Sequence, residues 1–246
     1  MRDEPLRCTP EAPERRNRAS TPTCADPCVA GGCDYTWLVT QLIMSRRSNT
    51  DERRAQIVHG LMAVMATHGY EGASVADVAA HAGLTPGLVH YHFKNKLEIL
   101  VELVRELARA HLAVVDAAIG AARDPAAQLK TYIDVHLGTG QHANPEALAC
   151  WVLATAEAVR DRRIRREVEH VLEALATRLD AIITRGIAAK QFARTDARAA
   201  AAGVLAVIQG YFVISATARD LIPPGSAART TLAMAHGLLR PPGGRA

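Results

Sequence analysis

The stretch SVADVAAHAGLTPGLVHYHF (residues 74–93) predicts two short helices joined by a tight turn. Ser74 and Thr85 are residue types that cap helix N-termini well. Gly83 is placed to end the first helix, because glycine adopts the left-handed backbone conformation that often follows a helix. Pro86 follows Thr85 at the first helical position, where its missing N–H costs nothing. This pattern is typical of a helix-turn-helix, whose second helix enters the DNA major groove.

The second predicted helix has an apolar and a polar face. Val89 and Phe93 are four residues apart, so we expect both to face inward against Val78, Ala82 and Ile57. The outward positions are Thr85, Pro86, Gly87, His90 and Tyr91, followed by Lys94 and Lys96. Hydroxyl groups and lysines can hold phosphates, and imidazole or phenol groups can reach base edges. We therefore expect this face to contact DNA.

Further cations and helix N-termini surround the same segment. Ser74 and Thr85 can add hydroxyl contacts at helix ends that attract phosphate. The basic arm after Met44 contributes more charge, and phosphate neutralisation by it predicts a steep salt dependence of binding. The expected DNA-contacting set is Arg46, Arg47, Arg53, Ser74, Thr85, Pro86, Gly87, His90, Tyr91, Lys94 and Lys96.

The rest of the chain also predicts helices, so the expected fold class is all-α. Alanine is abundant and aromatic residues make up 4% of the chain, with no alternating β-branched runs. We expect a first helix from Thr50 or Asp51 to Gly69 and a long helix from Lys94 to about residue 123. Four or five more helices are expected, near residues 125–138, 145–160, 162–189, 196–219 and 226–239.

Length and composition suggest how these helices are grouped. The chain has 246 residues, 49% of them apolar, which is enough for a substantial core. The expected divisions are a disordered extension over 1–43, with Met44 as an alternative start, a three-helix DNA-binding domain over 44–96, a helical ligand-binding and dimerisation domain over 97–240, and a disordered tail over 241–246. The charged first twenty residues do not resemble a secretory signal, so we expect a cytoplasmic protein.

The sequence predicts neither a metal nor a cofactor. Four of the five cysteines lie in the first 33 residues, at spacings that do not match paired zinc ligands. A cytoplasmic protein is also a poor setting for a disulfide framework. The chain has ten histidines but no H-E-x-x-H motif, phosphate loop or nucleophile elbow. A regulator is therefore expected rather than an enzyme.

Residues 54–100 resemble the N-terminal domain of the TetR family of transcription repressors. Its usual motif, G-V-S-x-G-x-L-Y-x-Y-F-x-x-K, corresponds here to GLTPGLVHYHFKNK (83–96), with histidine at positions 90 and 92 where relatives often carry tyrosine. The resemblance places Pro86 and Gly87 where other members have base-reading residues. Because neither side chain can donate a hydrogen bond, base readout is expected to depend on His90, Tyr91 and DNA shape.

An uncharged stretch of twenty residues, 199–218, is the candidate dimer interface. Its length also allows a membrane span, but its many Ala and Gly residues and the central Gln209 favour a buried helix. Small residues on one side would let a partner helix approach, giving a four-helix bundle across a two-fold axis, as TetR-family dimers usually form. The expected interface consists of Ala199, Gly203, Ala206, Val207, Gly210, Tyr211, Leu232, Ala235 and Leu239.

Residues 149–168 and 191–212 are similar to the C-terminal domains of regulators related to the choline-responsive BetI repressor. The similarity implies an effector-binding domain without assigning choline as the effector. The expected pocket is lined in part by His111, Tyr132, His136, Trp151 and Glu157. Trp151 with Glu157 could hold a cation, or Trp151 could be a core anchor and Glu157 a surface residue.

These features together predict a homodimeric repressor that binds a palindromic operator in double-stranded DNA. An unknown small-molecule effector would shift the dimer to a state that no longer fits the operator. The alternative is a constitutive or membrane-associated DNA-binding regulator without an effector.

Overall fold

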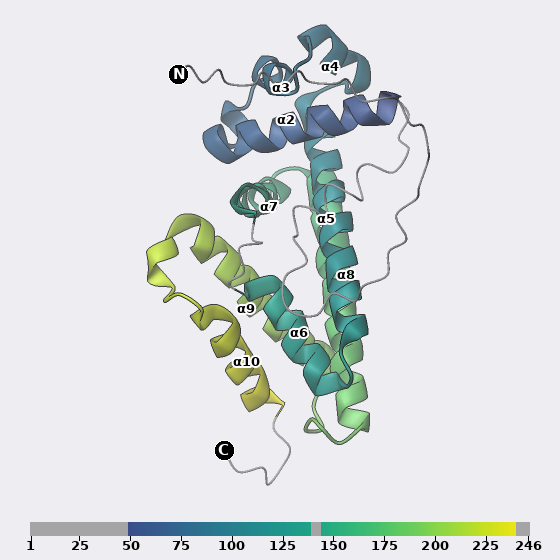
Figure 1. Ribbon diagram of the computed structural model, residues 1–246, viewed down its shortest axis with the longest axis vertical. Helices are drawn as coiled ribbons and strands as arrows, with labels where there is room; N and C mark the ends of the chain where they lie inside the picture. Colours follow the sequence, from purple (N-terminus) through teal and green to yellow (C-terminus); the bar gives the residue numbers. More distant parts are fainter. Residues whose placement is uncertain (1–48, 139–143, 240–246) are drawn as a thin grey trace, which may run out of the picture. The chain divides into compact units, whose positions relative to one another are not determined.

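The computed structural model describes residues 49–138 and 144–239. Within these ranges the regular structure is entirely helical (Figure 1), which confirms the all-α prediction. The helices are α2 (Asn49–Gly72), α3 (Val75–His81), α4 (Pro86–His92), α5 (Lys96–Ala121), α6 (Pro125–Leu137), α7 (Pro145–Ala158), α8 (Arg162–Ala188), α9 (Ala197–Thr217), the short 3₁₀ helix η1 (Arg219–Leu221) and α10 (Ser226–Leu238). The expected extension over 1–43, Arg46, Arg47, the first four cysteines and the tail over 241–246 lie outside the described residues.

Side-chain caps explain why the helices begin where they do. Ser74 and Asp77 form a reciprocal capping box at α3, in which each side chain satisfies a backbone N–H of the other. The Thr85 side chain accepts from the Leu88 N–H at the start of α4. Asparagine or aspartate caps α5, α6, α7, α8 and α9 in the same way. The turn between α3 and α4 depends on Gly83, whose φ of 65° is unfavourable for other residues.

Helix α2 crosses α3 at a glycine. A Cβ atom built on Gly60 would lie 2.6 Å from the backbone oxygen of Val78, closer than carbon and oxygen can approach. Near its end, α2 is interrupted at Gly69, whose φ of 70° and ψ of 174° are not helical. The sequence predicted that the first helix ends at Gly69. In the structure Gly69 interrupts α2, and the helix resumes after it and continues to Gly72.

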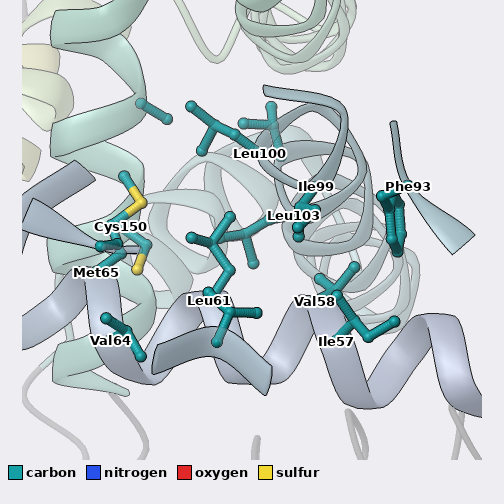
Figure 2. Close-up of a cluster of buried hydrophobic side chains, with 14 of the residues drawn as sticks. Ile57, Val58, Leu61, Val64, Met65, Phe93, Ile99, Leu100, Leu103 and Cys150 are labelled. Carbon is teal, nitrogen blue, oxygen red and sulfur yellow. The ribbon is translucent and has the colours of Figure 1, made fainter. Parts of the chain in front are cut away.

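The first hydrophobic core holds the helix-turn-helix together and extends beyond it (Figure 2). It contains apolar residues of α2 to α5 and also Cys150, Ala154 and Ala158 of α7 and Ile164 and Val168 of α8. The Cys150 thiol donates to the Met62 carbonyl of α2 at 3.4 Å. Helix α7 is thus part of the same core as the helix-turn-helix.

The second core lies among α5, α6, α8, α9 and α10. Two ion pairs join α5 to α8: Arg178 binds both carboxylate oxygens of Asp116 at 2.6 Å, and Arg105 binds Glu167 at 2.6 Å. Trp151 of α7 packs against both cores. The described residues accordingly belong to one compact unit, and the predicted boundary between residues 96 and 97 does not coincide with a gap in the packing.

Candidate DNA interface and effector region

Helix α4 presents an exposed face of the composition expected for DNA contact. Its exposed residues are Thr85, Pro86, Gly87, His90 and Tyr91, and Lys94 follows just after the helix. Tyr91 is 80% exposed, although a phenol ring usually buries much of its apolar surface. The ring lies edge to face with the neighbouring His92, at a centroid distance of 5.1 Å. A large aromatic group held in this way is available to a partner.

The opposite face of α4 is fixed firmly in the first core. Val89 is 1% and Phe93 is 2% exposed, as the spacing of the two residues predicted. Arg54 of α2 places its guanidinium group 4.1 Å from the centre of the Phe93 ring and donates to the His92 carbonyl at 2.7 Å. These two contacts hold the C-terminal end of α4, so the exposed face has a defined orientation on α2. Nothing in the sequence pattern indicated these contacts between Arg54 and the end of α4.

Besides Thr85, which caps α4, three residues of the expected DNA-contacting set have side-chain partners within the protein. The Lys96 ammonium group donates to the Tyr70 carbonyl at 2.7 Å and the Glu71 carbonyl at 3.3 Å, and it lies 4.5 Å from the centre of the Tyr70 ring. Lys96 therefore ties the start of α5 to the end of α2. The Ser74 hydroxyl binds Asp77 at 2.5 Å, and Arg53 binds Gln56 at 2.8 Å. Their contacts with DNA remain predictions.

Aromatic side chains from three helices meet in the second core, where the effector pocket was expected. His111 of α5 lies edge to face with His136 of α6 at a centroid distance of 4.6 Å. Tyr132 lies 4.5 Å from His136, and Phe212 of α9 stacks on His136 at 6.4 Å. Three of the five residues predicted to line the pocket are thus brought together.

Trp151 reaches the same region from α7, whereas Glu157 does not. The Trp151 indole N–H donates to the Gln209 side-chain oxygen at 2.8 Å. Gln209 lies one helical turn before Phe212 on α9, so the two side chains are neighbours on that helix. Glu157 acts near α2 instead: burial and the charge of Glu157 raise the pKa of Tyr70 to about 12. The described contacts therefore do not pair Trp151 with Glu157.

Several polar atoms of this region have no hydrogen-bond partner. Among the described residues, these buried atoms include Nε2 of His111, Nε2 of His136 and Nε2 of Gln209. Leaving such a group unsatisfied costs about 1–3 kcal/mol. Burial lowers the pKa of His111 to about 3 and that of His136 to about 4, so both rings are neutral near pH 7. We call the five side chains of His111, Tyr132, His136, Trp151 and Gln209 the buried polar cluster.

Two cavities lie elsewhere among the described helices. One cavity of about 110 Å³ lies between α5 and α8, lined by residues such as Ala108, Leu112 and Val171. A larger one of about 390 Å³ is lined mainly by charged side chains, including Arg54, Glu98 and Arg166. No residue of the buried polar cluster lines either of these two cavities.

Small and apolar side chains form an exposed face on α9 and α10. On α9 this face comprises Ala199, Gly203, Ala206, Gly210 and Val213, spaced three or four residues apart. On α10 it includes Met234 and Leu238, which are 55% and 49% exposed. A Cβ atom added at Gly203 or Gly210 would meet nothing within 4 Å. We call this surface the α9–α10 face.

The other predicted interface residues lie off this face. Ala235 and Leu239 are each 1% exposed and belong to the second core, because they point from α10 toward the rest of the protomer. Three other residues predicted for the interface are half-buried: Val207, Tyr211 and Leu232. Conversely, the exposed apolar residues Val213 and Met234 were not predicted from the sequence.

Helix α9 is also long and apolar enough to cross a membrane. Its most apolar window has a mean hydropathy of 1.8, and 28% of that window is buried. The buried side, however, packs against α6, α7, α8 and α10. The exposed part of α9 is mainly the stripe of small residues described above.

The comparison with known proteins agrees with this geometry. Residues 57–103 match the family model for bacterial regulatory proteins of the tetR family, and residues 125–240 match the model for the C-terminal part of BetI-type transcriptional repressors. The chain is 30% identical over 161 residues to the HTH-type transcriptional regulator BetI of Rhizobium meliloti (strain 1021), covering 65% of this chain and 76% of that protein. The chain belongs to the TetR family.

More distant relatives support the same assignment. BetI of Burkholderia lata is 27% identical over 185 residues, which is 75% of this chain and 90% of that protein. A solved TetR-family regulator from Rhodococcus sp. shares the fold with a TM-score of 0.65 at 22% identity, over 76% of this chain and 98% of the relative. A regulator from Saccharomonospora viridis, solved in complex with choline, has a TM-score of 0.64 at 21% identity over 75% and 94%. This TetR-family chain is therefore a DNA-binding transcriptional regulator with a BetI-type C-terminal domain, and the family is not one of enzymes.

Proposed function

We propose that this regulator is a cytoplasmic repressor that binds a palindromic operator as a homodimer and leaves it when a small molecule enters the buried polar cluster. The observation that carries the proposal is the exposed face of α4. Tyr91 is 80% exposed on a helix whose other side is fixed by Val89, Phe93 and Arg54. An immobile helix with an outward aromatic and polar face suits insertion into a major groove.

The α9–α10 face supports the homodimer. One seven-residue helix contacts too few base pairs for tight binding, so two copies are needed to read a two-fold symmetric site. Glycines and alanines at the centre of the face would allow close helix approach, and Val213, Met234 and Leu238 would bury apolar surface at its edges. A four-helix bundle made by α9 and α10 of both protomers would satisfy both requirements.

The buried polar cluster supports effector control. A ligand that supplied partners to its unsatisfied atoms would favour a conformation in which α5, α6, α7 and α9 are further apart. Helix α7 would transmit the change, because Cys150 and Ala154 belong to the first core together with α2. The choline complex of a solved relative supports a small molecule as the effector class.

The proposal is tested on DNA selected from random duplexes with the purified protein. We expect a palindromic consensus, and we expect Tyr91→Ala to abolish binding in fluorescence anisotropy without changing the melting temperature. Val159→Ala, at a position that is 74% exposed far along the chain from α4, is the matched control and should bind normally. Normal binding by Tyr91→Ala would refute the proposed readout, and a selected site without two-fold symmetry would refute the dimer.

A further inference from the structure

Hydrogen-bond chemistry determines which polar groups the buried polar cluster offers to a ligand. Nδ1 of His136 lies 2.7 Å from the Tyr132 carbonyl oxygen, which can only accept a hydrogen bond. Nδ1 must therefore carry the proton of the neutral ring. The unpartnered Nε2 of His136 is then a lone-pair acceptor, and it requires a donor from the ligand.

The orientation of the Gln209 amide follows by the same reasoning. An indole N–H can only donate, so the Gln209 atom that lies 2.8 Å from Nε1 of Trp151 must be the amide oxygen. The amide nitrogen is thereby directed elsewhere, and it is buried without a partner. It requires an acceptor from the ligand. The cluster therefore offers at least one acceptor and one donor.

The groups around these two atoms are uncharged and largely aromatic. His111, Tyr132 and Phe212 supply rings beside His136. No Asp, Glu, Lys or Arg takes part in the described contacts of these rings and Gln209. Arg178, whose charge acts on Tyr132, is already paired with Asp116 through two hydrogen bonds.

The geometry points to an uncharged hydroxylated aromatic compound, a phenol or aryl alcohol, as the effector, with a hydroxyl donor for Nε2 of His136 and an oxygen acceptor for Nε2 of Gln209. A hydroxyl group can serve as a donor and as an acceptor, so it suits both atoms. The aromatic body would stack among the rings of the cluster. This inference rests on the proposed function, since it names the ligand class of the proposed effector site.

A charged ligand fits less well. A buried carboxylate would require an arginine or lysine, and a buried cation would find aromatic rings but no ionised carboxylate among the described contacts of the cluster. The lowered pKa values of His111 and His136 show the same preference, because burial disfavours the positive form of both rings. The hydroxyl group of choline can donate to Nε2 of His136, but its ammonium group would have only ring faces as partners. Choline is thus expected to bind more weakly than a phenol.

The experiment measures binding to the full-length dimer carrying Trp37→Phe, which leaves Trp151 as the fluorescent reporter. The probes are phenols and aryl alcohols, each matched to its analogue without the hydroxyl group, for example 4-ethylphenol with ethylbenzene, together with choline and benzoate. Trp151 fluorescence and calorimetry should show binding of hydroxylated probes at least about tenfold tighter than their matched analogues and than choline or benzoate.

Two variants and a control assign the binding to the cluster. His136→Phe keeps a ring but removes Nε2, and Gln209→Met keeps the length but removes the amide. Each should weaken phenol binding by about tenfold or more and remove the preference for the hydroxyl group, while DNA binding shows that the variants are folded. His170→Phe, at an exposed histidine of α8, should change neither.

The outcomes separate this inference from the proposed function. Equal binding of matched pairs, tighter binding of choline or benzoate, or no binding by any probe overturns the inferred ligand class. If choline instead releases the operator, the effector-controlled repressor stands and only the ligand class fails. If phenols bind at the cluster without releasing the operator, the ligand class stands and effector control fails.

Discussion

Two neighbouring arginines of α2 have different surroundings. Arg54 stacks on Phe93 and holds the His92 carbonyl, so its charge is used to fix the end of the recognition helix. Arg53 is hydrogen-bonded only to Gln56 within the same helix among its described contacts. A cation over an aromatic ring contributes about 0.5–2 kcal/mol, and a hydrogen bond from a charged group about 1.5–3 kcal/mol.

Arg54→Gln is therefore expected to lower the free energy of unfolding by about 1–3 kcal/mol. It should also weaken operator binding, because α4 loses its support at His92 and Phe93. Arg53→Gln is the matched control and should change stability by less than about 0.5 kcal/mol. Urea titration followed by circular dichroism measures both, and equal midpoints for the two variants would contradict the assignment.

The buried histidines predict a pH dependence of stability. The pKa of His111 is lowered by burial to about 3 and that of His136 to about 4, both below the ordinary value of 6.5. As the pH falls below 6.5, these two histidines therefore become protonated in the unfolded chain but stay neutral in the folded chain. Stability contributed by the neutral rings is present above pH 6.5 and is lost toward pH 4, by up to about 1.4 kcal/mol per pH unit for each histidine.

Denaturant titrations between pH 7 and pH 4.5 measure this slope. The double variant His111→Gln/His136→Gln should have a flatter dependence than the parent chain. Asp77, Asp116 and Asp161 have lowered pKa values, so their stabilising contributions decline only below the ordinary value of 3.8, outside the measured range. An unchanged slope in the double variant would show that the two rings are not the titrating groups.

At the level of helices, the crossing of α2 and α3 depends on the absence of a side chain at Gly60. A Cβ atom there would lie 2.6 Å from the Val78 carbonyl oxygen, and backbone cannot yield as a flexible side chain can. Gly60→Ala is expected to destabilise the protein by about 1–3 kcal/mol through overpacking. Gly120→Ala in α5 is the control, because its Cβ would meet nothing within 4 Å and alanine favours the helix. Thermal unfolding should separate the two variants, and equal melting temperatures would contradict the tight crossing.

Helix α7 explains how the two cores are coupled. Its residues Cys150, Ala154 and Ala158 lie in the first core, and Trp151 packs against both cores. A displacement of α7 would therefore act on α2 directly and not only through α5. Trp151 of α7 is also the hydrogen-bond partner of Gln209. A ligand that displaced Gln209 would therefore act on α7, and through α7 on the core that supports α4.

For the whole molecule, the proposed dimer depends on the α9–α10 face. Gly203→Glu should produce a monomer that remains folded, because the new side chain enters open space in the protomer but would place a charge in the proposed interface. Operator affinity should fall on the order of 100-fold, because each half-site must then bind separately. Gly120→Glu, at an exposed glycine of α5, should leave the dimer intact. Light scattering after gel filtration measures both, and a dimeric Gly203→Glu would place the interface elsewhere.

Much of the fold was predictable because its signals are local. Ser74, Thr85, Gly83 and Pro86 mark helix ends through their own backbone and side-chain preferences, and the structure has helix ends at those positions. The inward positions of Val89 and Phe93 follow from helical periodicity alone. The expected break near Gly69 is likewise a property of a single residue.

Contacts between distant residues were not predictable in the same way. The roles of Arg54, Lys96 and Gly60 depend on groups up to 39 residues away, and nothing in the local pattern distinguishes them from ordinary surface or helix residues. The assignment of Ala235 and Leu239 to the dimer interface took the wrong side of α10, because an apolar stripe does not show which of two apolar faces is covered within the protomer.

The sequence by itself thus determined the helices, the helix-turn-helix and the polar composition of its outer face, since caps, turns and periodicity act over a few residues. Only the tertiary structure decided which polar groups remain without partners. His111, His136 and Gln209 are separated by up to 98 positions in the chain, and their unsatisfied atoms appear only when four helices enclose them. Hydrogen-bond satisfaction depends on neighbours in space, and for that reason the buried polar cluster and the exposed α9–α10 face could be defined only from the fold.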